Sequence, residues 1–86
     1  MPEISRFLGI VIRLHYADHD PPHFHASYQG RKVEVDIHTL AVIQGGVATR
    51  ALGLVMEWAA QHQAELAEDW RLAASGRPVR KIAPLA

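Results

Sequence analysis

The stretch that decides the fold is His23-Phe24-His25-Ala26-Ser27-Tyr28-Gln29-Gly30-Arg31-Lys32-Val33-Glu34-Val35-Asp36-Ile37-His38. Apolar and polar side chains alternate within 23–28 and again within 32–38, which is the period of a strand with one buried face. Gln29-Gly30 lies between the two segments and suits a two-residue turn. We therefore predict two antiparallel strands, over 23–28 and 32–38, joined as a hairpin.

The turn also predicts which residues face each other across the hairpin. With Gln29 and Gly30 as the loop, Tyr28 pairs with Arg31, and counting back gives every other pair. The remaining predicted pairs are Ala26 with Val33, His25 with Glu34, Phe24 with Val35, and His23 with Asp36. Apolar residues then meet on one face and histidines meet acids on the other, an agreement that a slip of one residue would destroy.

Further strands flank the hairpin on both sides. Residues Ile10–Tyr16 alternate in the same way and predict a strand before it. Residues Leu40–Gln44, closed by Gly45-Gly46, predict a strand after it. The β-rich part of the chain is therefore expected to end near residue 46.

From about Val47 the apolar period changes to that of a helix. The stripe consists of Leu52, Val55, Ala59, His62, Leu66, Trp70 and Ala73. One helix of about 25 residues, or two helices with a break near His62 and Gln63, satisfies this pattern. Ser75-Gly76-Arg77-Pro78 predicts the helix end. Residues Val79–Ala86 are expected to form a short, extended basic tail.

Strands followed by helix predict one two-layer α+β domain over residues 1–86. It is an antiparallel meander of three to four strands, followed by one long or two short helices packed on one sheet face. The helices are expected to cover Ile12, Leu14, Phe24, Ala26, Val33, Val35 and Ile37. The histidine face then looks toward solvent or a partner. Trp58 and Trp70 are both expected to pack rather than to stack on bases; Trp70 lies on the helix stripe, whereas Trp58 lies off it and could belong to a dimer interface.

The composition limits the class of protein. Among 86 residues, 49% are apolar and 21% are charged, which is typical of a folded domain. The charges of nine basic and nine acidic residues cancel, which argues against nucleic-acid binding over a broad basic surface. A local basic patch stays possible. Without cysteine, a metal would be held by His, Asp and Glu. Glu3 and Arg6 interrupt the apolar N-terminus, so we expect neither a signal peptide nor a membrane span, and a cytoplasmic location.

Polar chemistry concentrates in Asp18-His19-Asp20-Pro21-Pro22-His23-Phe24-His25, which holds three of the six histidines and two of the nine acids. Imidazoles and carboxylates bind divalent metals and move protons near neutral pH. The preceding strand brings Arg13 and His15 to the same polar face, because its apolar residues face the core. The predicted patch consists of Arg13, His15, His23, His25, Glu34 and Asp36, and the further binding candidates are Asp18, His19 and Asp20 together with Arg13.

Three functional interpretations of this patch stay open. In the first, a divalent metal such as Zn, Ni or Mn is bound. Its candidate ligands are His15, His23, His25, Glu34 and Asp36. In the second, His23 oriented by Asp36 acts as general acid or base beside Arg13, a set suited to cleavage of an RNA phosphodiester. In the third, the face recognises a partner protein or a nucleic-acid backbone. Each His–acid pair taken alone also fits a solvated cross-strand pair.

Several segments resemble a known family. They are Met1-Pro2-Glu3-Ile4-Ser5-Arg6-Phe7, Gly9-Ile10-Val11-Ile12, the Asp18–His25 string, Arg50-Ala51-Leu52 through Glu57-Trp58, and Gly76-Arg77-Pro78 through Lys81-Ile82-Ala83-Pro84-Leu85. Together they are similar, essentially end to end, to the small bacterial domain-of-unknown-function family four-one-six-zero. The resemblance implies a gene context like that of toxin–antitoxin pairs, and hence a small cognate protein partner. It supplies no catalytic residues.

We therefore expect a component of a toxin–antitoxin-type pair that binds protein, and RNA as a further ligand, through its His/Asp-rich face. A homo-oligomer is a second expected partner, and no membrane is expected. If the chain is an enzyme, phosphodiester hydrolysis of the ribonuclease type is the expected reaction. The alternative is a metal-binding protein or metal-dependent hydrolase that uses His23 and His25.

Overall fold

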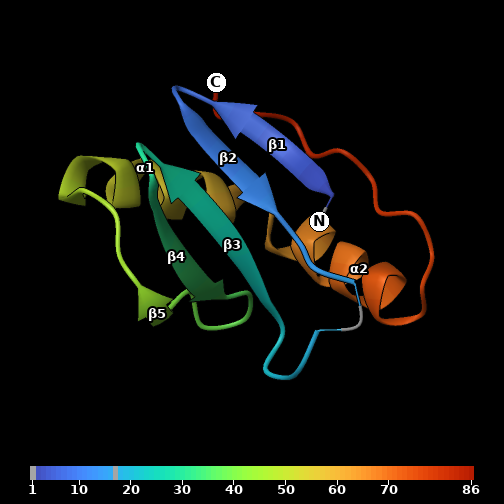
Figure 1. The fold of residues 1–86 in the computed structure, drawn as a ribbon. Helices are drawn as coiled ribbons and strands as arrows, with labels where there is room; N and C mark the ends of the chain where they lie inside the picture. The colour runs from blue at the N-terminus through green and yellow to red at the C-terminus, as the bar shows by residue number, and fades with distance from the viewer. Residues whose placement is uncertain (1, 17) are drawn as a thin grey trace.

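Five antiparallel strands form one sheet in the computed structural model, which describes residues 2–16 and 18–86 (Figure 1). They are β1 (Glu3–Phe7), β2 (Ile10–Arg13), β3 (His23–Tyr28), β4 (Arg31–Asp36) and β5 (Val42–Gly45). Each strand pairs with the next along the chain, so the sheet order is β1-β2-β3-β4-β5. The predicted meander is confirmed, but it has five strands rather than three to four.

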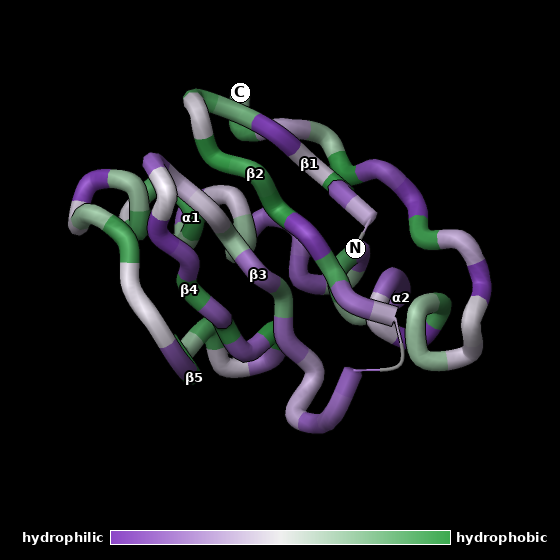
Figure 2. Tube along the Cα trace, viewed as in Figure 1, coloured by the Kyte–Doolittle hydropathy of each residue, from purple (hydrophilic) through white to green (hydrophobic). Residues whose placement is uncertain are grey.

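The central hairpin has the predicted register. Tyr28 pairs with Arg31, and each of the four remaining predicted pairs is present. Figure 2 shows hydrophilic and hydrophobic residues following one another along β4, as expected for a strand with one buried face. The apolar members of the hairpin, Phe24, Ala26, Val33 and Val35, are all buried, as the alternation predicts.

The additional strand is β1, which forms a hairpin with β2. Its register shifts between Glu3 and Ser5, and Ile4 and Ser5 are both buried, so a bulge interrupts the alternation that would mark a strand. The turn to β2 consists of Leu8 and Gly9, with φ values of 51° and 81°. Gly9 favours a turn, but a leucine rarely takes a positive φ, so Leu8-Gly9 is a weaker turn signal than Gln29-Gly30.

The turn between β4 and β5 begins earlier than predicted. Asp36 Oδ1 accepts hydrogen bonds from the backbone N–H groups of His38 at 2.7 Å and Thr39 at 2.9 Å, so β4 ends at Asp36. Leu40 then adopts a φ of 61°, and β5 starts only at Val42. An aspartate that accepts hydrogen bonds from the next amides favours a turn over continued strand.

Two helices, α1 (Thr49–Gln61) and α2 (Gln63–Ala74), cover one face of the sheet (Figure 1). The chain breaks between them at His62, whose φ of −131° is not helical. The His62 ring lies with Nδ1 2.6 Å from Glu65 Oε1. The two-helix alternative, with its break near His62, is therefore the correct one. Within the described residues, no helix is long and apolar enough to cross a membrane.

Trp58 lies in the core, and its predicted place at a dimer interface is wrong. Its side chain is fully buried, and its ring centroid lies 5.6 Å from that of Phe7 and 5.9 Å from that of Phe24. Its Nε1–H donates a hydrogen bond to the carbonyl of Ala83 at 2.8 Å. Trp58 follows buried Val55 by three residues, so the buried stripe of α1 is wider than the sequence pattern indicated.

The C-terminal tail is attached to the fold rather than free. Residues 77–86 run back from α2 toward β1 (Figure 1). Ile82 is buried, and its N–H donates to the carbonyl of Ile4 at 2.8 Å. The N–H of Arg80 donates to Oδ1 of buried Asp69 at 2.9 Å. The tail therefore closes the β1 side of the core.

Candidate metal centre

A row of polar side chains crosses the sheet on the face opposite the helices. Arg13, His25, Glu34 and Gln44 are register partners on β2, β3, β4 and β5. They line an open groove of about 620 Å³. The predicted polar face is thus a concave surface, and it carries both cationic and metal-ligating groups. The other groove-lining residues are His15, Ser27, Lys32 and Gly45.

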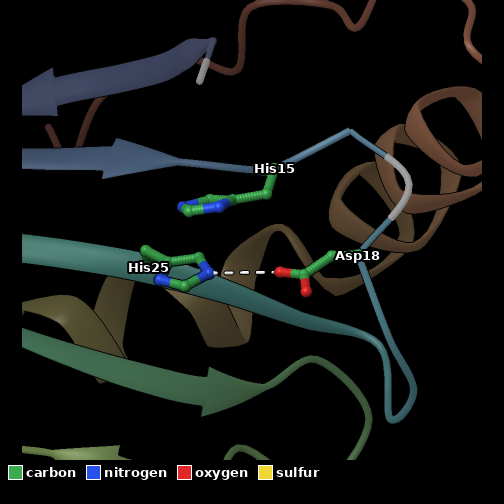
Figure 3. Close-up of side chains that lie close together, drawn as sticks. All are labelled: His15, Asp18 and His25. Atoms are coloured by element: carbon green, nitrogen blue, oxygen red, sulfur yellow. Dashed lines mark hydrogen bonds and ion pairs between the residues drawn. The ribbon is translucent and has the colours of Figure 1, made fainter.

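The loop between β2 and β3 folds one carboxylate over this face. Asp18 Oδ2 lies 3.0 Å from His23 Nε2 and 3.5 Å from His25 Nε2. Its other oxygen, Oδ1, accepts a hydrogen bond from the N–H of His19 at 2.9 Å. Figure 3 shows Asp18 pointing from the loop toward His25. One carboxylate oxygen therefore lies against two imidazole rings.

His15 completes this side of the groove. β2 ends at Arg13 rather than at Tyr16, so His15 lies in the segment that follows the strand. Its ring stacks on that of His25, with centroids 4.0 Å apart and planes at 23° (Figure 3). The predicted shared face of Arg13, His15 and His25 is therefore present, as all three line the groove.

His23 differs from the prediction because it is buried, with only 1% of its surface exposed. Its Nδ1 lies 2.7 Å from the carbonyl oxygen of Pro21, and its ring packs 5.2 Å from that of Trp70 on α2. Its Nε2 lies 3.0 Å from Asp18 Oδ2 and 3.5 Å from Glu34 Oε1. Trp70 on α2 and the β2–β3 loop therefore enclose a ring that the strand pattern predicted to face solvent.

Asp36 pairs with His23 in the backbone register but does not orient its ring. The Asp36 carboxylate accepts hydrogen bonds from the amides of Thr39 and His38, and these bonds lower the pKa of Asp36. Within the described residues, the carboxylates within 4.0 Å of the His23 ring belong to Asp18 and Glu34. Asp18 and Glu34, rather than the predicted Asp36, therefore lie beside the His23 ring.

Two groups of three side chains have the spacing of a metal site. His15, Asp18 and His25 form one, and His23, His25 and Glu34 form the other; within each group the ligand atoms lie within 4.8 Å of one another. The groups share His25. We call these five residues, His15, Asp18, His23, His25 and Glu34, the histidine–carboxylate cluster.

The electrostatics of the cluster favour the protonation states that ligands need. Burial lowers the pKa of His25, and the neighbouring His15 lowers it further. Burial by itself would raise the pKa of Asp18, but the His19 amide and the nearby imidazoles of His23 and His25 outweigh it, and the pKa lies below its usual value. At neutral pH the cluster therefore presents a neutral His25 and an ionised Asp18, as metal binding requires.

Two ring nitrogens of the cluster have no hydrogen-bond partner. Nε2 of His15 and Nε2 of His23 are both buried atoms, and neither is satisfied within the described residues. The 3.0 Å approach of His23 Nε2 to Asp18 Oδ2 is close enough for a hydrogen bond but is not aligned as one. Buried polar atoms of this kind usually have a partner, so both nitrogens are candidates to bind a metal ion.

The remaining candidates lie at the margin of the cluster. The His19 side chain is 81% exposed, with its Nε2 3.8 Å from Asp18 Oδ1, and Asp20 is exposed in the same loop. Arg13 donates a hydrogen bond from Nη1 to Ser27 Oγ at 3.2 Å. The structure therefore brings His15, His23, His25 and Glu34 together, adds Asp18, and leaves His19 and Asp20 on the surface.

Comparison with known proteins identifies a family and no characterised relative. The family described as Domain of unknown function (DUF4160) matches residues 9–71. No curated protein and no solved structure matches the chain. The matched segment contains all five residues of the histidine–carboxylate cluster.

Proposed function

The chain belongs to the Domain of unknown function (DUF4160) family, and we propose that it binds a divalent transition-metal ion through the histidine–carboxylate cluster. The observation that carries this proposal is the unpartnered Nε2 of His23, on a ring that is 1% exposed. Two carboxylates, those of Asp18 and Glu34, lie within 3.5 Å of this atom. Two carboxylate oxygens and the Nε2 atom therefore lie close enough together to bind one cation.

The hydrogen bond at the other end of the ring sets the tautomer of His23. The Pro21 carbonyl is only an acceptor, so the Nδ1 atom 2.7 Å away must carry the proton. A neutral His23 then directs the lone pair of Nε2 toward Asp18 and Glu34. This is how metal-binding histidines are usually held, with one ring nitrogen bound to a carbonyl and the other free for the metal.

The neighbouring rings bring several possible ligands to one place. The ring of His23 lies 5.1 Å from that of His25, which in turn stacks on His15 at 4.0 Å. Burial and the neighbouring His15 lower the pKa of His25, which keeps a lone pair of its ring available to a metal. One metal ion accepts lone pairs from several of these groups at once.

The ligand types indicate which metals to test. Imidazole nitrogens with carboxylate oxygens suit Zn²⁺ and Ni²⁺, with Mn²⁺ expected to bind more weakly. The absence of cysteine from the sequence leaves no thiolate to favour softer ions. We therefore expect the order of affinity Ni²⁺ and Zn²⁺ above Mn²⁺.

The test is elemental analysis and calorimetric titration of Zn²⁺, Ni²⁺ and Mn²⁺ into untagged protein. The variants His25→Gln and Asp18→Asn each remove one ligand from side chains that are 15% and 16% exposed, so the core is left intact. His38→Gln is the matched control, since His38 is exposed and lies outside the cluster. We expect near-stoichiometric binding that weakens about tenfold or more in both ligand variants. Equal affinity in all four proteins would refute the proposal.

A second candidate function is that of a partner-binding component of a toxin–antitoxin-type pair. Support comes from β5, an edge strand whose four residues are all exposed. Val42 and Ile43 are 44% and 43% exposed, which is unusual for large apolar side chains in a strand. An unpaired apolar edge of this kind can add a strand from another protein.

Expression of the chain alone in cells tests the toxin form of this second candidate. Growth arrest that disappears in a His23→Ala/His25→Ala variant would favour an active toxin, with phosphodiester hydrolysis of RNA as the reaction to assay. Equal, harmless expression of both proteins would exclude the toxin role. The metal titration above is independent of this result, so the two candidate functions are tested separately.

A further inference from the structure

We infer that the groove beside the histidine–carboxylate cluster binds a phosphate group, held by Arg13, Lys32 and the metal ion. The inference deepens the proposed metal function and relies on it for one of the three contacts. It comes from the part of the groove that the cluster does not use. There, two cationic side chains and one hydroxyl face the same space.

The sheet register places both cations next to a proposed metal ligand. Arg13 is the direct cross-strand partner of His25, so their Cα atoms lie about 5 Å apart. Lys32 pairs with Ser27, two residues along β3 from His25 and on the same face. Both cationic side chains are long enough to reach an anion seated over His25 and Ser27.

Neither cation has a close ion-pair partner: among the described residues, no carboxylate oxygen lies within 4.0 Å of Arg13 or Lys32, whereas Arg6 pairs with Glu3 and Arg71 pairs with Glu68. Glu3, the β1 register partner of Arg13, interacts with Arg13 only at longer range. Arg13 gives one N–H to Ser27 Oγ, and the rest of its five-donor fork remains available. Because the Ser27 hydroxyl accepts that bond, its own hydrogen is free to donate to an anion.

The combination of groups suits phosphate better than a carboxylate. A phosphate offers several oxygens that a guanidinium fork, an ammonium and a metal ion can share. Glu34 is the one carboxylate in the groove lining, and the metal would neutralise it. A groove of about 620 Å³ also has room for more than a free phosphate ion. Inorganic phosphate, a phosphomonoester and a phosphodiester all carry such oxygens, and the test below distinguishes these sources.

The test uses Co²⁺ as a paramagnetic substitute for Zn²⁺ and follows the ³¹P resonance of inorganic phosphate. Co²⁺ bound in the cluster should broaden the ³¹P resonance of phosphate bound in the groove, and the broadening should saturate as the groove fills. Arg13→Gln and Lys32→Gln should each weaken phosphate binding about tenfold, the usual effect of losing one charge-assisted contact, while Co²⁺ affinity is unchanged. Arg31→Gln is the matched control, because it removes the same charge from an exposed β4 residue outside the groove lining.

The outcomes separate this inference from the proposed function. If Co²⁺ does not bind, the metal function is wrong and the phosphate inference is wrong with it. If Co²⁺ binds but phosphate does not, or if Arg13→Gln and Lys32→Gln bind phosphate as wild type does, only the phosphate inference is wrong. Parallel titrations of adenosine monophosphate and a short single-stranded RNA then identify the source. Tighter binding of either supports the inference and assigns a monoester or a diester.

Discussion

Replacing Ile82 by alanine should destabilise the fold strongly, although Ile82 is only four residues from the C-terminus. Its side chain is 4% exposed and belongs to the core, and its N–H donates to Ile4 on β1. The change deletes three buried carbons, worth about 0.8 kcal/mol each, and leaves a cavity that adds to the loss. We expect a fall of about 2.5 to 4 kcal/mol in the free energy of unfolding.

Urea denaturation followed by tryptophan fluorescence measures this loss, because Trp58 donates a hydrogen bond to Ala83, the residue after Ile82. The slope of the unfolding free energy against urea should stay the same while the midpoint falls. In a chain of 86 residues the melting temperature should drop by at least about 10 °C. Ile82→Val, which removes one carbon, should lose only about 1 kcal/mol.

The control is Arg77→Ala, which lies in the same tail but is exposed. It should change the free energy of unfolding by no more than about 0.5 kcal/mol. A loss below about 1 kcal/mol for Ile82→Ala, similar to that of Arg77→Ala, would mean that the tail does not pack on the core in solution. The reasoning about the C-terminal closure of β1 would then be wrong.

Three further predictions concern single positions. Gly45→Ala should lower the free energy of unfolding, measured in urea, by at least about 2 kcal/mol, because an added Cβ would lie 2.3 Å from the Lys32 carbonyl oxygen at a φ of +76°. Gly30→Ala, which has open space around it, should lower this free energy by less. Equal losses in the two variants would contradict the prediction. Burial and the nearby Glu65 raise the pKa of Asp69, so its ionised form is less favourable in the folded protein than in the unfolded chain. Relative to wild type, Asp69→Asn should therefore gain stability as the pH rises from about 4 to about 7, and a change in the opposite direction would refute this. Trp58→Phe should lower the free energy of unfolding by about 1 to 2 kcal/mol, because the Ala83 carbonyl loses its hydrogen-bond donor. An unchanged melting temperature would mean that this hydrogen bond does not stabilise the fold.

The central hairpin could be predicted from local pattern alone. The alternation of residues 32–38 and the Gln29-Gly30 turn predicted the register of His23–Tyr28 on Arg31–Asp36 correctly, pair by pair. Strand pairing of this kind depends on neighbouring residues and on one buried face, both of which are visible in sequence. The helix end before Gly76 could be predicted from local signals in the same way, whereas the sequence left open whether the helix breaks near His62.

The missed features each depend on contacts between distant segments. β1 lacked a clean alternation because of its bulge, and its strand is defined by pairing with β2. Trp58 was assigned to an interface because its burial depends on Phe7, Phe24 and the C-terminal tail, none of which is near it in sequence. Period alone does not reveal how wide a buried stripe is when several elements pack against it.

The sequence by itself determined the α+β class, the hairpin register, and the presence of Arg13, His25 and Glu34 on one face, because these follow from strand alternation. Only the tertiary structure decided how the side chains are used. In the folded chain, the β2–β3 loop places Asp18 against His23 and His25, and the Asp36 carboxylate accepts hydrogen bonds from the amides of the next turn. The fold also buries His23 against Trp70. Loop path and side-chain direction are set by packing between elements, and packing is not a periodic property of the chain.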